Sequence, residues 1–240
     1  MTEDIARLIG LLDHDSVESA EDAKAKLMWI GVDVIQPLMS AVPFLHRYGQ
    51  LSAIEIFEQL GDPRAVPVLI DLLDCEHETV REWSALALAK LNVRTAAPAL
   101  QAAYQRLRTR GTPPDFSEAV ALRGVLTEFG ARRAVMPPLT ASLRVSISTL
   151  DAAWPVTRLE EVINDLAEHD QAVLYFQLWT TGDSGTYWTS HETLHWEFDS
   201  HAPWPRTVAT ARDAALLEAA FITIRENLFA TVEWIDESDA

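Results

Sequence analysis

The residues best suited to chemistry are two histidines and a glutamate in the stretch SHETLHWEFDSH, residues 190–201. His191, Glu192 and His195 follow the spacing His-Glu-x-x-His. On a helix, positions i and i+4 share a face, so both imidazoles could reach one Zn²⁺ while the glutamate activates a bound water. The spacing therefore indicates metal-dependent hydrolysis as one hypothesis, provided that the stretch is helical and another ligand completes the site.

The third zinc ligand has no clear candidate. Glu218, Asp199 and His201 could each be nominated, but none stands in a known signature. With 7 histidines in 240 residues, the pattern itself is expected by accident in roughly one or two such chains per hundred. We therefore expect no catalytic residue, no metal and no cofactor. Zinc hydrolysis stays as the alternative, with His191, Glu192 and His195 as catalytic residues and His191, His195 and Glu218 as metal ligands.

Secondary structure decides between these readings. Residues 171–180, QAVLYFQLWT, predict a strand because they are rich in aromatic and β-branched side chains. A strand needs a partner, and residues 186–198 follow after the turn sequence TGDSG. In that second strand His191 and His195 would lie about 13 Å apart, too far for one zinc ion. Alternatively, VSIS at 145–148 could pair with the first strand and leave HETLH to form a helix.

Composition predicts a soluble, globular chain. Hydrophobic residues make up 48% of the 240 residues, no run of about 18 apolar residues occurs, and the N-terminus is acidic where a signal peptide is basic. We therefore expect a cytoplasmic protein. The single cysteine, Cys75, excludes an internal disulfide framework and is expected to be a small, partly buried hydrophobic residue.

The net charge of -17 is unevenly distributed. Residues 151–240 contain 17 acidic residues and four arginines, a net charge of -13, so the first 150 residues carry -4. A field of this sign repels phosphate backbones and anionic lipid, so we expect binding to neither nucleic acid nor membranes. A basic protein partner would be attracted, although the acidity could equally serve solubility.

A repeated phrase runs through the first 140 residues: an apolar residue and Gly or Asn, then Pro followed by Leu. The turn residues are Gly31, Gly61, Asn92 and Gly130, and the prolines are Pro37, Pro67, Pro98 and Pro137. Each unit predicts two helices, because Gly or Asn suits a helix C-cap with positive φ and Asp62-Pro63 suits a helix start. Since one such pair cannot bury its apolar face alone, the pairs should stack into an α-solenoid.

The unit at residues 60–92, LGDPRAVPVLIDLLDCEHETVREWSALALAKLN, resembles a HEAT-like repeat of the short bacterial kind that also occurs in phycobilin lyases. The resemblance covers residues 4–143 and implies protein or peptide binding on the concave face lined by the second helices. It implies no chemistry. Asp62, Arg64 and Arg81 are expected to make hydrogen bonds between helices. A phycobilin-lyase-like accessory protein is a further alternative, although no residue here identifies a bilin site.

Within this unit Trp83 and Leu86 occupy positions where small or charged residues are more usual, and Lys90 follows them. The two apolar residues could form an exposed contact ridge. The competing interpretation is that Trp83 and Leu86 pack against neighbouring structure. After residue 143 the repeat ends, and six of the eight tryptophans lie in the last 90 residues. There the pattern predicts helix, strand, strand and helix, the last helix running through residues 207–234 with Ala214, Leu217, Phe221, Ile224 and Leu228 on its apolar face.

These observations predict a mainly α fold: residues 1–143 as a HEAT-like α-solenoid of about four helix pairs, and residues 144–240 as a small, acidic, Trp-rich α/β cap with a β-hairpin and a long C-terminal helix. The expected function is non-catalytic protein binding, as a scaffold, accessory factor or inhibitor of the immunity-protein type. The expected partner is basic. The residues predicted to contact it are Trp83, Leu86, Lys90, Trp188, Trp196, Glu197 and Asp199.

Overall fold

The computed structural model describes residues 2–114, 116–132, 135–147, 150–182, 185–188, 199, 201–223 and 227–239. The chain divides into two compact units. Unit 1 comprises Met1–Arg110 and Phe116–Arg133, and unit 2 comprises Gly111–Asp115 and Ala134–Ala240. The HEAT-like helical part and the small α/β part of the predicted fold are both present.

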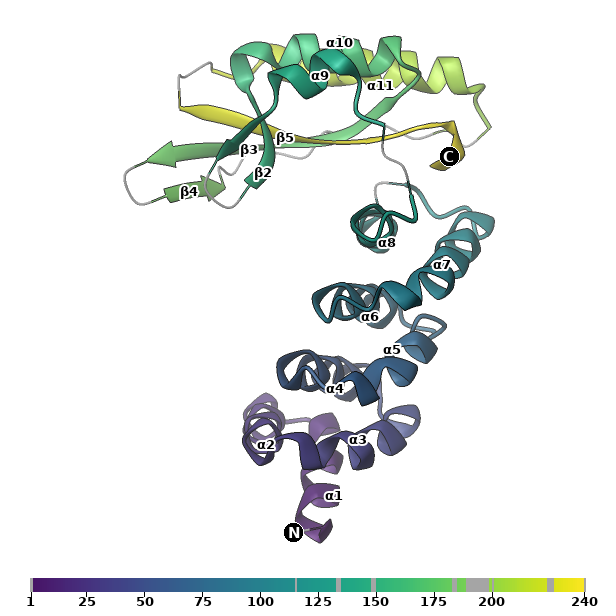
Figure 1. Cartoon of the computed structure of the whole chain (residues 1–240), viewed down its shortest axis with the longest axis vertical. Helices are drawn as coiled ribbons and strands as arrows, with labels where there is room; N and C mark the ends of the chain where they lie inside the picture. The colour runs from purple at the N-terminus through teal and green to yellow at the C-terminus, as the bar shows by residue number, and fades with distance from the viewer. Residues whose placement is uncertain are drawn as a thin grey trace. The chain divides into compact units, whose positions relative to one another are not determined.

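Unit 1 is a stack of four helix pairs within its described residues (Figure 1). The first helices of the pairs are α1 (Thr2–Gly10), α3 (Ile35–Ala41), α5 (Val66–Leu72) and α7 (Ala97–Thr109). The second helices are α2 (Val17–Ile30), α4 (Arg47–Leu60), α6 (Glu78–Lys90) and α8 (Ser117–Glu128). Each second helix contacts the next, so that α2, α4, α6 and α8 form one layer. Short 3₁₀ segments are Leu11–Asp13, Val32–Val34, Val42–Phe44, Pro63–Ala65 and Arg94–Ala96.

The repeated turn residues have the conformation that the sequence predicts. Gly31, Gly61, Asn92 and Gly130 all have positive φ, between 52° and 83°. Pro63 begins a 3₁₀ turn, and the side chain of Asp62 caps it by accepting the backbone N–H of Arg64 at 2.9 Å. Each turn ends one helix and starts the next, so these few positions set the period of the stack.

Two arginines connect neighbouring repeats, as predicted. Arg64 forms an ion pair with Asp62 and donates to the carbonyl of Val32, one repeat earlier, at 3.2 Å. Arg81 of α6 makes a two-pronged ion pair with the buried Glu118 of α8, with both nitrogen–oxygen distances at 2.6 Å. These bonds fix the register of one repeat against the next, while a continuous apolar core fills the space between the layers.

Unit 2 is a five-stranded antiparallel sheet with helices packed on it (Figure 1). Its helices are α9 (Pro138–Leu143), α10 (Leu159–Glu168) and α11 (Trp204–Ala220), with 3₁₀ turns at Val156–Arg158 and Glu237–Asp239. Its strands are β1 (Val145–Ile147), β2 (Leu150–Pro155), β3 (Ala172–Gly182), β4 (Gly185–Trp188) and β5 (Leu228–Ile235). The strand order is β1-β2-β5-β3-β4, so the last strand lies between β2 and β3.

The core of unit 2 lies between this sheet and the helices. β3 contacts both α10 and α11, and α10 also contacts α9. Trp154 of β2 is fully buried and meets Trp234 edge to face, with ring centroids 6.1 Å apart. Trp204 is also buried and donates its indole N–H to the carbonyl of Asp170 at 2.9 Å. At least these tryptophans therefore serve packing rather than partner binding.

Several elements of unit 2 agree with the predictions from the sequence. The helix predicted before the first strand is α10, the strand predicted at 171–180 is β3, and a C-terminal helix is present as α11. β4 pairs with β3 in a hairpin, with Trp179 opposite Trp188 and Gly182 opposite Gly185. The alternative pairing of residues 145–148 with this strand is wrong, because β1 pairs with β2.

The predicted extent of the C-terminal helix is also wrong. The helix ends at Ala220, and residues 228–235 form β5. Leu217 and Phe221, assigned to its apolar face, are exposed, and the helix instead buries Trp204, Val208, Ala211 and Ala215. Along β5 every second residue from Leu228 to Val232 is buried, which is the alternation of a strand. The helical spacing that seemed to continue through this region was accidental.

Candidate functional site

The predicted contact ridge lies along the second-helix layer of unit 1. Trp83 and Leu86 of α6 are 39% and 43% exposed, so neither is buried against the neighbouring helices. Lys90, one turn further along α6, forms an ion pair with Glu58 of α4. We call Trp83, Leu86 and Lys90 the α6 ridge. Large apolar side chains at this exposure are available for contact with another molecule.

Beside Trp83 lies a groove of about 810 Å³, formed wholly within unit 1. It crosses the second-helix layer from α2 through α4 to α6. We call it the α2–α4–α6 groove, and its lining residues are Leu12, Asp13, His14, Asp15, Val17, Ala20, Glu21, Lys24, His46, Tyr48, Leu51, Ser52, Glu55 and Trp83. Tyr48 is 67% exposed, and Arg47 stacks on its ring with the guanidinium carbon 4.6 Å from the ring centroid. The groove thus combines aromatic surface with charge.

A lysine held between two carboxylates joins α2 to α4 in this groove. Lys24 contacts Glu21 at 2.8 Å on its own helix and Glu55 of α4 at 2.6 Å. Burial opposes the charged form of Lys24, but the hydrogen bonds to Glu21 and Glu55 outweigh this effect and raise the pKa of the ammonium. Lys24 is therefore a charged structural link whose donors are already directed to two acceptors.

One groove carboxylate also holds the backbone of α4 in place. Asp13 accepts the backbone N–H of His46 at 2.8 Å and that of Gly49 at 2.9 Å. These are the N-cap and N3 positions of α4, whose N–H groups have no partner within the helix. Asp13 thus caps α4 from a different segment of the chain, which orients Tyr48 and His46 at the rim.

Most of the sequence-predicted site residues of the last 90 positions lie outside the part of the chain that the structure describes. His191, Glu192, His195, Trp196 and Glu197 lie outside the described residues. Trp188 ends β4.

Other residues nominated in this region are placed. Asp199 is exposed, and its carboxylate accepts the backbone N–H of His201 at 2.9 Å. Glu218 is exposed on α11. Within the described ranges, no group of three or more His, Cys, Asp or Glu side chains could hold a metal ion. Cys75 is partly buried and donates its thiol to the side-chain oxygen of Gln50 at 3.3 Å, as befits a structural cysteine.

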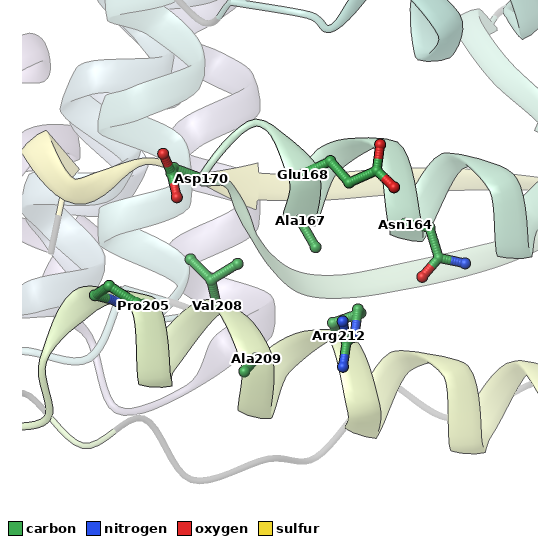
Figure 2. A pocket seen from close by; sticks show the side chains of 8 residues that line it. All are labelled: Asn164, Ala167, Glu168, Asp170, Pro205, Val208, Ala209 and Arg212. Atoms are coloured by element: carbon green, nitrogen blue, oxygen red, sulfur yellow. The ribbon is translucent and has the colours of Figure 1, made fainter.

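A smaller pocket of about 300 Å³ lies between α10 and α11 in unit 2 (Figure 2). Asn164 of α10 points toward Arg212 of α11 across it, and Glu168 and Asp170 also line it. The Arg212 guanidinium binds the neighbouring carboxylate of Asp213 at 2.7 Å. Half of its lining residues are small and apolar, and none of the polar ones is buried, so this pocket has no evident chemistry.

Of the residues that line the groove, only Trp83 was predicted as a contact residue from the sequence. The signal for the rest of the groove is present in the spacing of two helices: Val17, Glu21 and Lys24 on α2, and Tyr48, Ser52 and Glu55 on α4, follow helical intervals of three and four. What the spacing could not give is the alignment of these two rows with Trp83, because that depends on how the second helices stack.

The fold of unit 1, stacked pairs of antiparallel helices with their second helices in one layer, defines an α-solenoid. Residues 35–110, which include α3 through α7, match the family model of HEAT repeats. Over this range the chain is similar to HEAT repeats, which are generally protein-interaction scaffolds. The C-terminal region matches no family model, and no curated protein matches the chain. Within the described residues, no single helix is long and apolar enough to cross a membrane.

Proposed function

We propose that this protein is a non-catalytic interaction module that binds a basic partner protein. The second-helix layer of unit 1, with the α6 ridge at its centre, makes the main contact. The observation that carries the proposal is the exposure of Trp83 and Leu86, two large apolar side chains on the second-helix layer, which the resemblance to HEAT repeats implies as the binding face. Tryptophan is among the residues that dominate interface energies when it becomes buried.

Charge supports a basic partner. The chain carries a net charge of -17, with -13 in residues 151–240. Such a field accelerates association with a positively charged protein and weakens as salt is added. Trp188, Trp196, Glu197 and Asp199 are proposed as secondary contacts on the acidic unit. An inhibitor of the immunity-protein type that covers a basic partner, and an accessory factor that holds one in a complex, both fit this surface.

Site-specific photo-cross-linking in the native host tests the proposal. A photoreactive amino acid is placed at position 83 or 86, and at Gln101, an exposed position on α7 in the first-helix layer, as the control. We expect one discrete basic protein to be cross-linked from positions 83 and 86 but not from 101, with less product at about 0.5 M salt. Equal labelling from all three positions, or a strongly acidic partner, would contradict the proposal.

A further inference from the structure

The α2–α4–α6 groove has the dimensions of a binding site for a short extended segment. Packed helices lie about 8–10 Å apart, so a groove that crosses three of them spans roughly 16–20 Å. An extended chain advances about 3.3 Å per residue, and the groove therefore accommodates about five or six residues. Its volume of about 810 Å³ leaves room for several of their side chains.

The charge of the groove selects the chemistry of that segment. Among its lining residues, Asp13, Asp15, Glu21 and Glu55 are carboxylates, and Lys24 is the lysine that faces them. Because Lys24 already donates to Glu21 and Glu55, it offers little to an incoming anion. Asp15 is exposed in the loop before α2, and Glu21 is 58% exposed beside Lys24. An excess of three negative charges remains, which favours a cation.

The aromatic side chains favour a guanidinium over an ammonium. Trp83 and Tyr48 both border the groove and are both exposed. Tyr48 already stacks with a guanidinium, that of Arg47. Arginine binds aromatic faces and carboxylates at the same time, since its planar group stacks while its N–H donors form two-pronged hydrogen bonds. Val17 and Leu51 supply apolar contacts for a neighbouring aliphatic residue.

We propose that the α2–α4–α6 groove binds an arginine-containing, extended segment of a partner protein, with the guanidinium between the carboxylates of Asp15 and Glu21 and the ring of Tyr48, and with Trp83 contacting a further residue of the segment at the α6 end. This inference rests on the proposed function and names the feature that the partner presents. The second-helix layer then has two parts: the α6 ridge makes apolar contacts with the partner, and the groove binds an arginine side chain of the partner.

Binding of a labelled synthetic peptide tests the inference. The probe is a fluorescein-labelled eight-residue peptide of alternating arginine and leucine, and its matched control replaces each arginine by citrulline, which has nearly the same shape but no charge. Fluorescence anisotropy with the full chain gives the two dissociation constants. We expect the arginine peptide to bind at least about tenfold more tightly than the citrulline peptide at low salt.

Variants then locate the binding. Asp15→Asn combined with Glu21→Gln is expected to weaken arginine-peptide binding about tenfold. The matched control, Asp33→Asn combined with Asp71→Asn, removes the same charge from exposed positions outside the groove and is expected to change the dissociation constant less than about twofold. Trp83→Ala should weaken binding about tenfold, while Trp83→Phe, which keeps an aromatic face, should lose less. Thermal unfolding confirms that each variant is folded.

Three outcomes overturn the inference: no measurable binding of the arginine peptide, equal binding of the citrulline peptide, or equal losses in the groove and control variants. These outcomes are distinct from failure of the proposed function. If a basic protein is cross-linked from position 83 but any of these three peptide results is obtained, the proposed interaction module is supported and arginine binding in the groove is rejected. If the peptide binds in the groove but no protein is cross-linked from positions 83 and 86, the proposed interaction module is rejected instead.

Discussion

The carboxylate of Asp13 occupies the space that a side chain on Gly49 would need. Asp13 accepts the N–H groups of His46 and Gly49, and a Cβ on residue 49 would lie 2.4 Å from Oδ1 and 2.8 Å from Cγ of Asp13. Gly49 is helical and buried, so its lack of a side chain serves this contact rather than an unusual backbone conformation. The glycine at position 49 is thus explained by Asp13, a residue of the preceding repeat whose carboxylate caps α4.

The effect of Gly49→Ala should therefore depend on residue 13. In the native chain, alanine gains up to about 1 kcal/mol of helix propensity but displaces a cap worth about 1 kcal/mol, so the net change should be close to zero or unfavourable. In the Asp13→Ala background the clash is absent, and Gly49→Ala should stabilise by up to about 1 kcal/mol. Urea unfolding of the two single variants and the double variant measures this coupling. Additive effects would show that the two residues do not interact as described.

The ion pair between Arg81 and Glu118 should make a large contribution to unit 1 as long as both partners are present. Glu118 is 2% exposed, and Arg81 also donates to the carbonyls of Cys75 and Glu76 at 2.8 Å and 3.0 Å. Arg81→Leu leaves a buried carboxylate without its partner and should cost about 3–5 kcal/mol in urea unfolding. The double variant Arg81→Leu with Glu118→Leu should recover much of that loss. A double variant less stable than Arg81→Leu would contradict this explanation.

Protonation of Asp62 at low pH should lower the stability of unit 1. The hydrogen bond from the Arg64 side chain lowers the pKa of Asp62 below its usual value of 3.8. A carboxylate with a lowered folded pKa contributes stability that is fully present above the usual value and is lost as the pH falls through the folded value. Asp62→Asn keeps the capping oxygen but removes the charge. The denaturation midpoint of the native chain should therefore fall more steeply below pH 3.8 than that of Asp62→Asn. Parallel curves would assign the acid sensitivity to other groups.

The α6 ridge should be unimportant for stability, because its residues are exposed. Leu86→Ser, at 43% exposure, should change the free energy of unfolding by less than about 1 kcal/mol. Leu88→Ala, two residues along the same helix but fully buried, should cost about 2–5 kcal/mol. Thermal or urea unfolding of this matched pair checks the distinction. If Leu86→Ser lowered the free energy of unfolding as much as Leu88→Ala, Leu86 would pack within the protein and would not be available to a partner.

The solenoid could be predicted because its information is local and repeated. Gly31, Gly61, Asn92 and Gly130 each end a helix by adopting positive φ, a property that depends on the residue itself and little on its surroundings. The α/β unit was harder, because β5 is a central strand that pairs with distant residues: Ala230 lies beside both Trp154 and Leu178. A short apolar segment that follows a helix carries no local sign of such pairing.

The candidate site also has one part that could be predicted from local sequence and one part that depends on how the repeats stack. Trp83 and Leu86 could be found from one helix, because two large apolar residues at i and i+3 among small ones are visible in the sequence. The groove needs Asp15, Lys24, Tyr48 and Glu55 from three segments, and their approach depends on the stacking of repeats. The link from Lys24 to Glu55 spans 31 positions, close to the repeat length, so corresponding sites in successive repeats were where such a contact could have been sought.

In unit 2, a buried aspartate of α10 should hold α9 and β2 together. Both the backbone N–H and the hydroxyl of Thr140 donate to Oδ2 of Asp165 at 2.6 Å, and the carbonyl of Thr140 accepts the indole N–H of Trp154 at 2.8 Å. Thr140 and Asp165 are both buried, so removing the carboxylate leaves two donors without an acceptor. Asp165→Ala should therefore cost about 2–4 kcal/mol in urea unfolding.

The matched control for Asp165 is His169, the residue that follows the end of α10. Its ring is 48% exposed and lies 3.4 Å from the other oxygen of Asp165, so His169→Ala should cost less than about 1 kcal/mol. Thr140→Val removes the hydroxyl but keeps the backbone N–H bond, and its cost should fall between those of the other two variants. This order follows from the number of fully buried hydrogen bonds that each change removes: two for Asp165→Ala, one for Thr140→Val and none for His169→Ala. If Asp165→Ala proved no worse than His169→Ala, the aspartate could not be the group that fixes α9 on the sheet.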